Sequence, residues 1–270
     1  MYKKIKRIIS LLKNDKRSHH HLEVNKSYIN ENFDFFINKK KLPDKSINRI
    51  FTFAKSLIQQ EENFKKDDMW NFITSQNDHK EFIDVCIRDD IEKFNQTINS
   101  ANKTKLTQGF LNYYNYEDLI SSKKNRLKES TQFIDKLISI AEYKKDINVF
   151  NPEQGNWIVK EDDYSNLIKK VFCIDNRTIK PFISPNYTYG LKNDKYFYSL
   201  KDLKSFYTAI RIKEILKNHK LKQINEIGAG LGFLPYYSSK INKTFYNVFD
   251  LPLVLILQSY YLILSLGDEK

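Results

Sequence analysis

The residues best suited to chemistry in this chain are a cluster of glycines next to an acid. Three of the seven glycines, Gly228, Gly230 and Gly232, fall within five residues. Glycine lets a turn adopt positive φ and lets a ligand approach the main chain closely. An apolar run ending in Glu226 precedes the cluster, and a helix-like stretch follows it. This order predicts a strand, a tight turn and a helix whose first N–H groups can bind a nucleotide-type cofactor.

Two acids distinguish between the nucleotide cofactors. Glu226 ends the first predicted strand, and Asp250 ends the second, where such folds place a ribose-binding acid. A pyrophosphate dinucleotide prefers Gly-x-Gly-x-x-Gly, and Phe233 occupies the last position of that pattern. A carboxylate beside the turn also disfavours an anionic pyrophosphate. It suits S-adenosylmethionine, which carries an ammonium, a sulfonium, a ribose and an adenine, so we predict this cofactor.

The same stretch resembles a known family. Residues 226–232, acid-x-Gly-x-Gly-x-Gly, look like the first motif of class I S-adenosylmethionine-dependent methyltransferases. With Phe249-Asp250-Leu251-Pro252 and the Leu-Gln-Ser-Tyr-Tyr-Leu stretch at 257–262, the chain is similar to a family of sugar O-methyltransferases. The specific match covers about residues 203–266. The resemblance implies a helical N-terminal region before a Rossmann-like domain.

The resemblance also implies roles for individual residues. The cofactor loop would consist of Gly228, Ala229, Gly230 and Gly232. Glu226 would lie near the methionine end of the cofactor, Asp250 would hold the ribose, and Leu251 would pack against the adenine. Gln258 and Tyr260 are further candidates, although a helix at that place can simply be core.

The resemblance implies methyl transfer to a hydroxyl of a sugar or glycan precursor. The enzyme would place the hydroxyl in line with the sulfonium, and a general base would remove its proton. The sequence does not identify that base; His79 and His219 are candidates only because they are imidazoles. No metal site is predicted. Two alternatives stay open: a non-catalytic binding or scaffold protein with methyltransferase architecture, and an NAD- or nucleotide-sugar-binding oxidoreductase, which Phe233 disfavours.

The elements that must position these residues follow from apolar spacing. A helix from Leu203 precedes an alternation of strands and helices. Pro235 is tolerated in the first turn of one predicted helix, and Gly267 ends the last. The predicted elements are strand Leu221–Ile227, helix Phe233–Ile241, strand Thr244–Phe249 and helix Pro252–Leu266. The fold class is therefore α/β, with the first half of a Rossmann-like, doubly wound parallel sheet.

The preceding part of the chain is predicted to be different. Residues 26–150 carry apolar residues at helical spacing, and residues 151–200 are irregular, with strand-like pieces at Trp157–Val159 and Val171–Ile174. We place a domain boundary near residue 180, giving a mainly α-helical domain 1–180 and a methyltransferase-like domain 181–270. The aromatic cluster at 112–116 could stack on a sugar ring or pack a loop.

Two parallel strands do not form a self-sufficient sheet, and their edges would lie open. We therefore expect the chain to be an inactive fragment of a longer protein, or one whose sheet a partner completes. Such a chain should bind S-adenosylmethionine poorly by itself and tend to aggregate. Its oligomeric state is not predicted.

The composition indicates which other kinds of partner and which location to expect for this protein. The net charge of +12 comes mostly from lysine, and the few arginines are scattered, so we predict a basic solvated surface and no nucleic-acid partner. The two isolated cysteines form no disulfide framework and suit a cytoplasmic protein. No stretch is apolar for long enough to be a transmembrane helix. Residues 1–18 predict a basic amphipathic helix, docked on its own domain or in contact with a membrane surface, and His19-His20-His21 predicts a solvated tract.

Overall fold

The structure is a computed structural model that describes residues 41–59, 71, 75–101, 104–107, 123–144, 161–183, 190–193, 196–242 and 244–267. Four predictions lie outside these ranges: the helix at 1–18, the histidine tract at 19–21, the aromatic cluster at 112–116 and the strand at 157–159. Within the described ranges, no helix has both the length and the hydrophobicity needed to cross a lipid bilayer.

Residues 26–150 are mainly helical where they are described, as predicted, but the helix at Glu161–Val171 was not expected, because residues 151–200 were predicted to be irregular. Apolar residues at helical spacing form the buried faces, for example Ile47, Ile50 and Ala54 in the first helix. The elements are α4 (Asp44–Ile58), α6 (Asn77–Ile87), α7 (Ile91–Asn99), the short 3-10 helix η4 (Lys105–Thr107), α9 (Lys123–Tyr143) and α10 (Glu161–Val171).

Two short antiparallel hairpins follow, β1 (Cys173–Ile174) with β2 (Arg177–Thr178) and β3 (Gly190–Asn193) with β4 (Tyr196–Ser199). The predicted strand at 171–174 is therefore only partly right, because Val171 ends α10. The Lys144 ammonium donates to the carbonyls of Lys170, Val171 and Cys173 at 2.7, 2.7 and 2.8 Å. A distant lysine thus satisfies carbonyls that the helix end leaves without helical partners.

The C-terminal part contains the predicted alternation of strands and helices. Its elements are α11 (Leu200–His219), β5 (Gln223–Ile227), α12 (Phe233–Ile241), β6 (Phe245–Phe249) and α13 (Pro252–Leu266). Gly267, with a φ of 91°, is the C-cap of α13, as predicted. Helix α11 begins at Leu200 instead of Leu203, because Ser199 and Asp202 form a capping box.

The described residues form a mixed, mostly helical fold with three two-stranded sheets. One of them is parallel: β5 pairs with β6 in a register that joins Gln223 to Phe245 and Ile227 to Phe249. The Rossmann-like, doubly wound sheet predicted from the sequence is not present in the described ranges beyond this single pair of strands.

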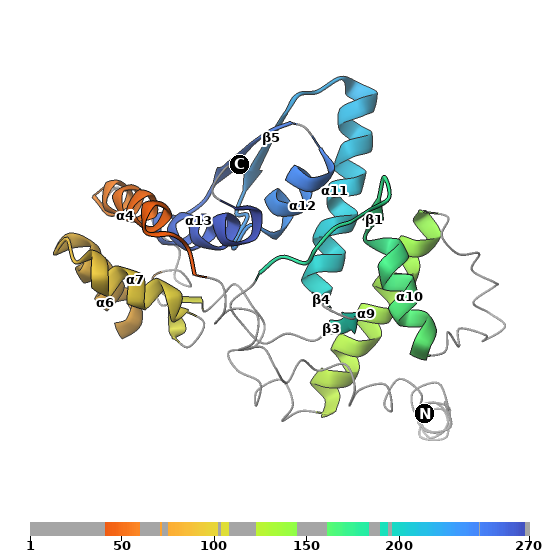
Figure 1. The fold of residues 1–270 in the computed structure, drawn as a ribbon, viewed down its shortest axis with the longest axis horizontal. Helices are drawn as coiled ribbons and strands as arrows, with labels where there is room; N and C mark the ends of the chain where they lie inside the picture. The colour runs from red at the N-terminus through yellow and green to blue at the C-terminus, as the bar shows by residue number, and fades with distance from the viewer. Residues whose placement is uncertain are drawn as a thin grey trace, which may run out of the picture.

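The helices of the first half flank the C-terminal part on two sides (Figure 1). Helix α4 packs against α13, with α6 and α7 beyond it, and α9 packs against α11, with α10 beside it. The Tyr260 hydroxyl donates to Asn99 Oδ1 at 2.6 Å, which links α13 to the C-terminal end of α7. The domain boundary near residue 180 stays a prediction.

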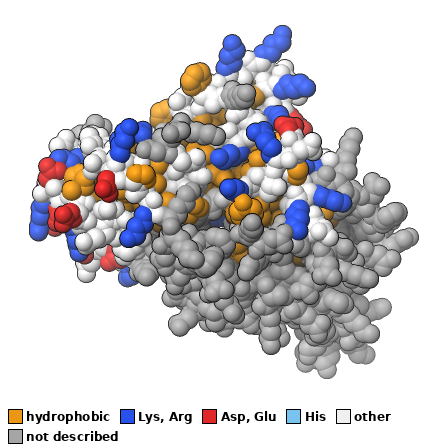
Figure 2. Space-filling view, in the orientation of Figure 1, with side chains coloured by type: hydrophobic (Ala, Val, Ile, Leu, Met, Phe, Trp, Pro, Cys, Tyr) orange, Lys and Arg blue, Asp and Glu red, His pale blue; other side chains and the backbone are white. Residues whose placement is uncertain are grey.

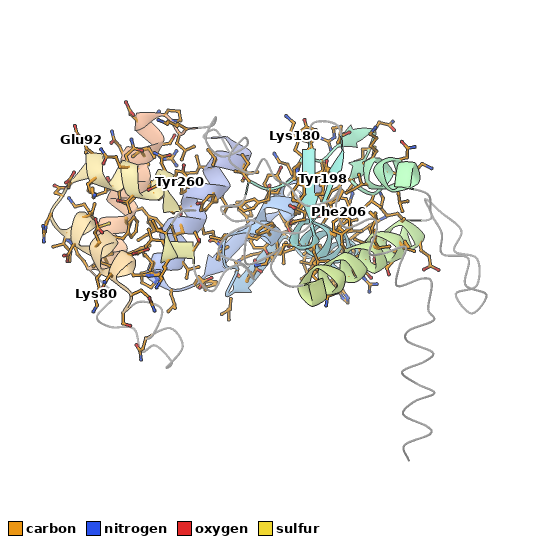
Figure 3. The ribbon with its side chains drawn as sticks, turned by 90° about the horizontal axis from the view of Figure 1, so that it is seen from below. Lys80, Glu92, Lys180, Tyr198, Phe206 and Tyr260 are labelled. Atoms are coloured by element: carbon orange, nitrogen blue, oxygen red, sulfur yellow. The ribbon has the colours of Figure 1, made fainter. Side chains whose placement is uncertain are left out.

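Aromatic packing joins α11 to its neighbours. Tyr198 and Phe206 lie close together in this part of the molecule (Figure 3), each with its ring against Phe172, at centroid distances of 4.1 and 4.6 Å. On the surface, Lys and Arg side chains are spread over the visible face and do not gather in one stripe (Figure 2).

Candidate functional site

The glycine cluster forms a loop at the carboxyl edge of the parallel pair of strands. Gly228, Gly230 and Gly232 have φ values of 76°, 58° and 93°, so the predicted positive-φ turn is confirmed. The Gly228 N–H donates to the Phe249 carbonyl at 2.9 Å, so the pairing of the strands continues into the loop. Because parallel strands end at the same edge, the loop after β5 lies beside Asp250, which follows β6.

Two of the glycines face different surroundings. A Cβ added at Gly228 would meet no atom within 4 Å, so this residue faces open space. A Cβ at Gly232 would lie 2.9 Å from Leu262 Cγ and 3.1 Å from Gln258 Cγ. Gly232 therefore allows α12 to start close against α13, whereas Gly228 leaves room for a ligand.

The Asp250 carboxylate holds the loop in place. Its Oδ2 accepts from the Gly230 N–H at 3.1 Å, and its Oδ1 accepts from the Leu251 N–H at 2.9 Å. Gln258 Nε2 donates to the Gly230 carbonyl at 2.9 Å from the other side. Burial raises the pKa of the Asp250 carboxyl, and the two N–H donors oppose that rise. A carboxylate has about four acceptor positions, so Asp250 keeps capacity for ligand hydroxyls.

Glu226 is held by a tyrosine from the neighbouring strand. The Tyr246 hydroxyl donates to Glu226 Oε2 at 2.7 Å. Burial raises the pKa of the Glu226 carboxyl, the hydrogen bond from Tyr246 opposes this, and the negative charge of Asp250 adds to it. Burial and the adjacent Glu226 raise the pKa of Tyr246 as well. A ligand cation placed here would offset the free-energy cost of burying the two carboxylates in their charged forms. It would also weaken their mutual repulsion.

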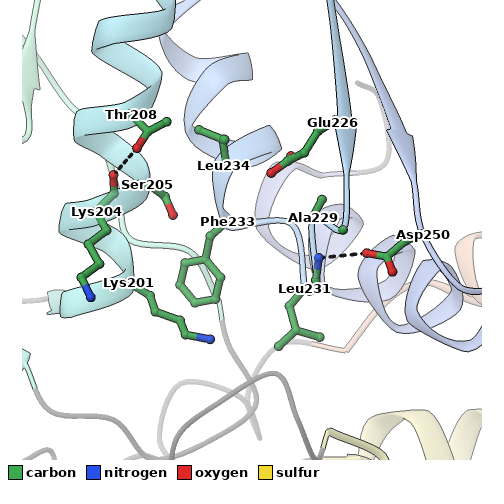
Figure 4. A pocket seen from close by; sticks show the side chains of 12 residues that line it. Lys201, Lys204, Ser205, Thr208, Glu226, Ala229, Leu231, Phe233, Leu234 and Asp250 are labelled. Carbon is green, nitrogen blue, oxygen red and sulfur yellow. Dashed lines mark hydrogen bonds between the residues drawn. The ribbon is translucent and has the colours of Figure 1, made fainter. Parts of the chain in front are cut away.

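A cavity of about 450 Å³ joins the loop to α11 (Figure 4). This volume lies within the usual range for small-molecule sites, roughly 300–1,000 Å³. Besides Glu226 and Asp250, the side chains that line it come from the loop, from the start of α12 and from one face of α11. They are Lys201, Lys204, Ser205, Thr208, Ala229, Leu231, Phe233 and Leu234, with the backbone of Gly228 and Gly230 between them.

Most of the predicted cofactor residues therefore meet at one cavity: Glu226, Gly228, Ala229, Gly230 and Asp250 line it. Gly232 and Leu251 are not among its lining residues; Gly232 packs against α13 and Leu251 precedes that helix. Of the further candidates, Gln258 supports the loop from behind, and Tyr260 points to Asn99.

The two histidines lie elsewhere. His79 is buried in α6, and His219 is exposed at the end of α11. Neither is among the described residues that line the cavity. The described ranges also contain no group of three or more His, Cys, Asp or Glu residues arranged to hold a metal ion.

Sequence reasoning missed the part of the site that α11 supplies. Lys201, Lys204, Ser205 and Thr208 are spaced i, i+3, i+4 and i+7, which places them on one helix face. The sequence showed this polar face beside the apolar face of α11. It did not show that the polar face lies opposite the glycine loop, because that depends on the fold. Tyr246 was missed too, although its strand alternation with Val248 puts both on the half-buried face.

The residues present fit the predicted cofactor. The open face of Gly228 lets a ligand approach the main chain, and a cationic ligand would stabilise the charged forms of the two half-buried carboxylates that line the same cavity. Phe233, where a dinucleotide loop has its last glycine, is buried against Phe182 at a ring-centroid distance of 4.5 Å. Comparison of the chain with known protein families, with curated proteins and with solved structures found no match.

Proposed function

We propose that this protein binds S-adenosylmethionine in the cavity between the glycine loop and α11 and transfers its methyl group to a hydroxyl of a sugar or glycan precursor. One observation carries the proposal: an acid, a positive-φ glycine loop and a second acid meet around one cavity at the carboxyl edge of two parallel strands. The resemblance of residues 203–266 to sugar O-methyltransferases supports the choice of acceptor.

The residues of the cavity would divide the binding between them. Glu226, held by Tyr246, would pair with the ammonium of the cofactor. Asp250 would accept hydrogen bonds from the ribose hydroxyls with the acceptor positions that the Gly230 and Leu251 N–H groups do not use. The loop backbone at Gly228 and Ala229 would lie against the cofactor. When bound, the cofactor supplies the reactive methyl sulfonium. The protein's contribution is then to orient the acceptor and exclude water.

Calorimetry with S-adenosylhomocysteine and with NAD tests the proposal. We expect S-adenosylhomocysteine to bind the chain at one site, weakly because the parallel sheet has only two strands in the described ranges, and NAD to bind more weakly still. Gly228→Ala should weaken that binding at least about tenfold, because its methyl group would take the space in which the ligand approaches the main chain.

Gly267→Ala is the matched control. Gly267 also has positive φ, and a Cβ there also meets no atom within 4 Å, but it lies at the end of α13 and not among the cavity residues. Both substitutions place a Cβ at a positive φ, so both should lose stability through backbone strain. Equal loss of binding in both variants, or tighter binding of NAD by the parent chain, would contradict the proposal.

A further inference from the structure

We propose that the end of α11 and the amino edge of the two parallel strands form a docking surface for a membrane that contains anionic lipids. We call this surface, residues 213–222 with Phe245, the basic tip. The inference goes beyond the proposed function, because the cavity lies at the opposite, carboxyl edge of the same strands. Docking through the basic tip therefore leaves the cavity facing away from the membrane.

The basic tip projects from the body of the protein. Helix α11 runs out to the upper end of the molecule in Figure 1, where the chain turns into β5. Of residues 213–222, only Leu216 is buried, and all the others are exposed. The Leu221 N–H donates to the Leu216 carbonyl at 3.0 Å, and the Phe245 N–H donates to the Lys222 carbonyl at 3.2 Å. These two bonds hold the end of the helix and the starts of both strands together.

The basic tip exposes apolar side chains. Leu221 is 53% exposed and Phe245 is 79% exposed, and Ile215, near the end of α11, is 49% exposed. Exposed apolar groups surrounded by polar residues mark surfaces that meet a membrane or another protein. The charge of the tip decides between these partners.

The same surface carries an excess of positive charge. Its only acid, Glu214, lies with Oε2 3.8 Å from Arg211 Nε of the same helix. Within the described part of the chain, none of the lysine ammonium groups of the tip forms an ion pair with a carboxylate. These lysines are Lys213, Lys217, Lys220 and Lys222. The tip therefore attracts an anionic partner.

An anionic bilayer matches both properties of the tip. Its headgroups attract lysines, and the boundary of its acyl chains accepts apolar side chains. Lysine stems can lie along this apolar layer while their ammonium groups stay among the headgroups. A second copy of the chain would instead bring like charges together. A nucleic acid would offer phosphates but no hydrocarbon layer for Leu221, so the charge and the apolar groups together favour a lipid surface.

Co-sedimentation with lipid vesicles tests the proposal. The full chain is mixed with vesicles of phosphatidylcholine alone or with vesicles that contain about one third phosphatidylserine. We expect binding to the anionic vesicles only. High salt should weaken this binding, because salt screens the attraction between the lysines and the headgroups.

A triple variant tests the lysines: Lys213→Gln with Lys217→Gln and Lys222→Gln. It should weaken binding to the anionic vesicles at least about tenfold, because each lysine near an anionic surface contributes about fivefold. A control variant removes the same charge from exposed lysines in or next to α4 and α6, and its binding should change less than about twofold. The control is Lys41→Gln with Lys45→Gln and Lys80→Gln.

A double variant tests the apolar groups: Leu221→Ser with Phe245→Thr. It should weaken binding at least about fivefold, because two side chains no longer enter the acyl boundary. Ile227→Thr with Phe249→Thr is the control, since it removes exposed apolar side chains at the carboxyl end of the same two strands. This control should bind the vesicles as the parent does, and circular dichroism checks that every variant folds.

Every other pattern of results overturns the proposal. A parent chain that does not bind anionic vesicles has no such surface, and variants of the tip that bind as the parent does, or controls that lose as much, place the binding elsewhere in the chain. Loss of binding in the lysine variant but not in the apolar variant shows a surface that recognises anions such as nucleic-acid phosphates without a bilayer. None of these measurements needs a bound cofactor, so they do not depend on the proposed function.

Discussion

Glu226 is the residue at which stability and binding oppose each other. Its carboxylate is half-buried beside Asp250, so the folded protein disfavours its charged form, and its pKa lies above the ordinary value of 4.5. A carboxyl whose pKa is raised on folding lowers stability as the pH rises through the window above its unfolded pKa. The same negative charge is what would attract a ligand cation.

We therefore expect Glu226→Gln to stabilise the ligand-free protein at pH 7.5 and to leave its stability nearly unchanged at pH 4. At pH 4 the glutamate is mostly neutral in both states, like the amide, whereas at pH 7.5 its charge is accommodated better in the unfolded chain than in its half-buried position in the folded protein. The Tyr246 hydroxyl can donate to the amide oxygen as it does to the carboxylate. Urea unfolding at the two pH values measures the difference.

Glu214→Gln is the control, because Glu214 is exposed on α11 and does not line the cavity. It should show no comparable gain at pH 7.5. Binding of S-adenosylhomocysteine should fall in Glu226→Gln and not in Glu214→Gln. A Glu226→Gln variant that is less stable than the parent at pH 7.5 would rule out burial as the dominant influence on the pKa of this carboxyl.

At the scale of the elements, Asp202 holds together the structure on which the cavity depends. Its Oδ1 accepts from the Phe182 N–H at 3.1 Å and the Tyr237 hydroxyl at 2.7 Å. Its Oδ2 accepts from the N–H and the hydroxyl of Ser199 at 2.7 and 2.6 Å. One buried carboxylate thus joins the start of α11 to α12 and to the segment after β2. Burial raises its pKa, and these four donors oppose that rise.

We expect Asp202→Ala to cost at least about 3 kcal/mol of unfolding free energy, since it leaves several buried donors without an acceptor at about 1–3 kcal/mol each. Ser199→Ala removes the helix cap but keeps Asp202 bound to Phe182 and Tyr237, so it should cost only about 1 kcal/mol. Denaturant unfolding of the two variants compares them. Equal losses would show that the cap alone matters and that the link to α12 contributes nothing.

Local signals predicted some element boundaries well and others poorly. Helices α12 and α13 begin and end where the sequence placed them, because Gly232, Pro252 and Gly267 mark their ends. The start of α11 was placed too late because the capping box of Ser199 and Asp202 was not recognised. The end of α10 at Val171 was misplaced, and there the Lys144 ammonium, far away in the sequence, donates to the Val171 carbonyl.

At the scale of the whole molecule, the parallel pair β5–β6 leaves one face open. Residues alternate between exposed and half-buried along both strands. Ile227, Phe245 and Phe249 on the open face are 88, 79 and 56% exposed. Parallel sheets are usually covered on both faces, and an exposed apolar sheet face promotes association.

We expect the double variant Ile227→Thr with Phe249→Thr to reduce concentration-dependent self-association, measured by light scattering, and binding of a hydrophobic dye. Threonine is β-branched and favours strands, so the sheet should persist. Ile87→Thr is the control, because Ile87 is 67% exposed but lies on α6, away from the sheet. If Ile87→Thr reduces association as much as the double variant does, the sheet face is not its cause.

By itself, the sequence determined the parts of this protein that depend on local chemistry. The glycines at 228, 230 and 232 adopt positive φ because few other residues do so without strain, and Pro and Gly mark the ends of α13. Only the tertiary structure decided what lies opposite the glycine loop. Lys201 and Lys204 reach the cavity because α11 packs against α12, and Tyr246 reaches Glu226 because of the register of β5 and β6. Such contacts join residues far apart in the chain, and their energies depend on packing between elements that no local pattern encodes.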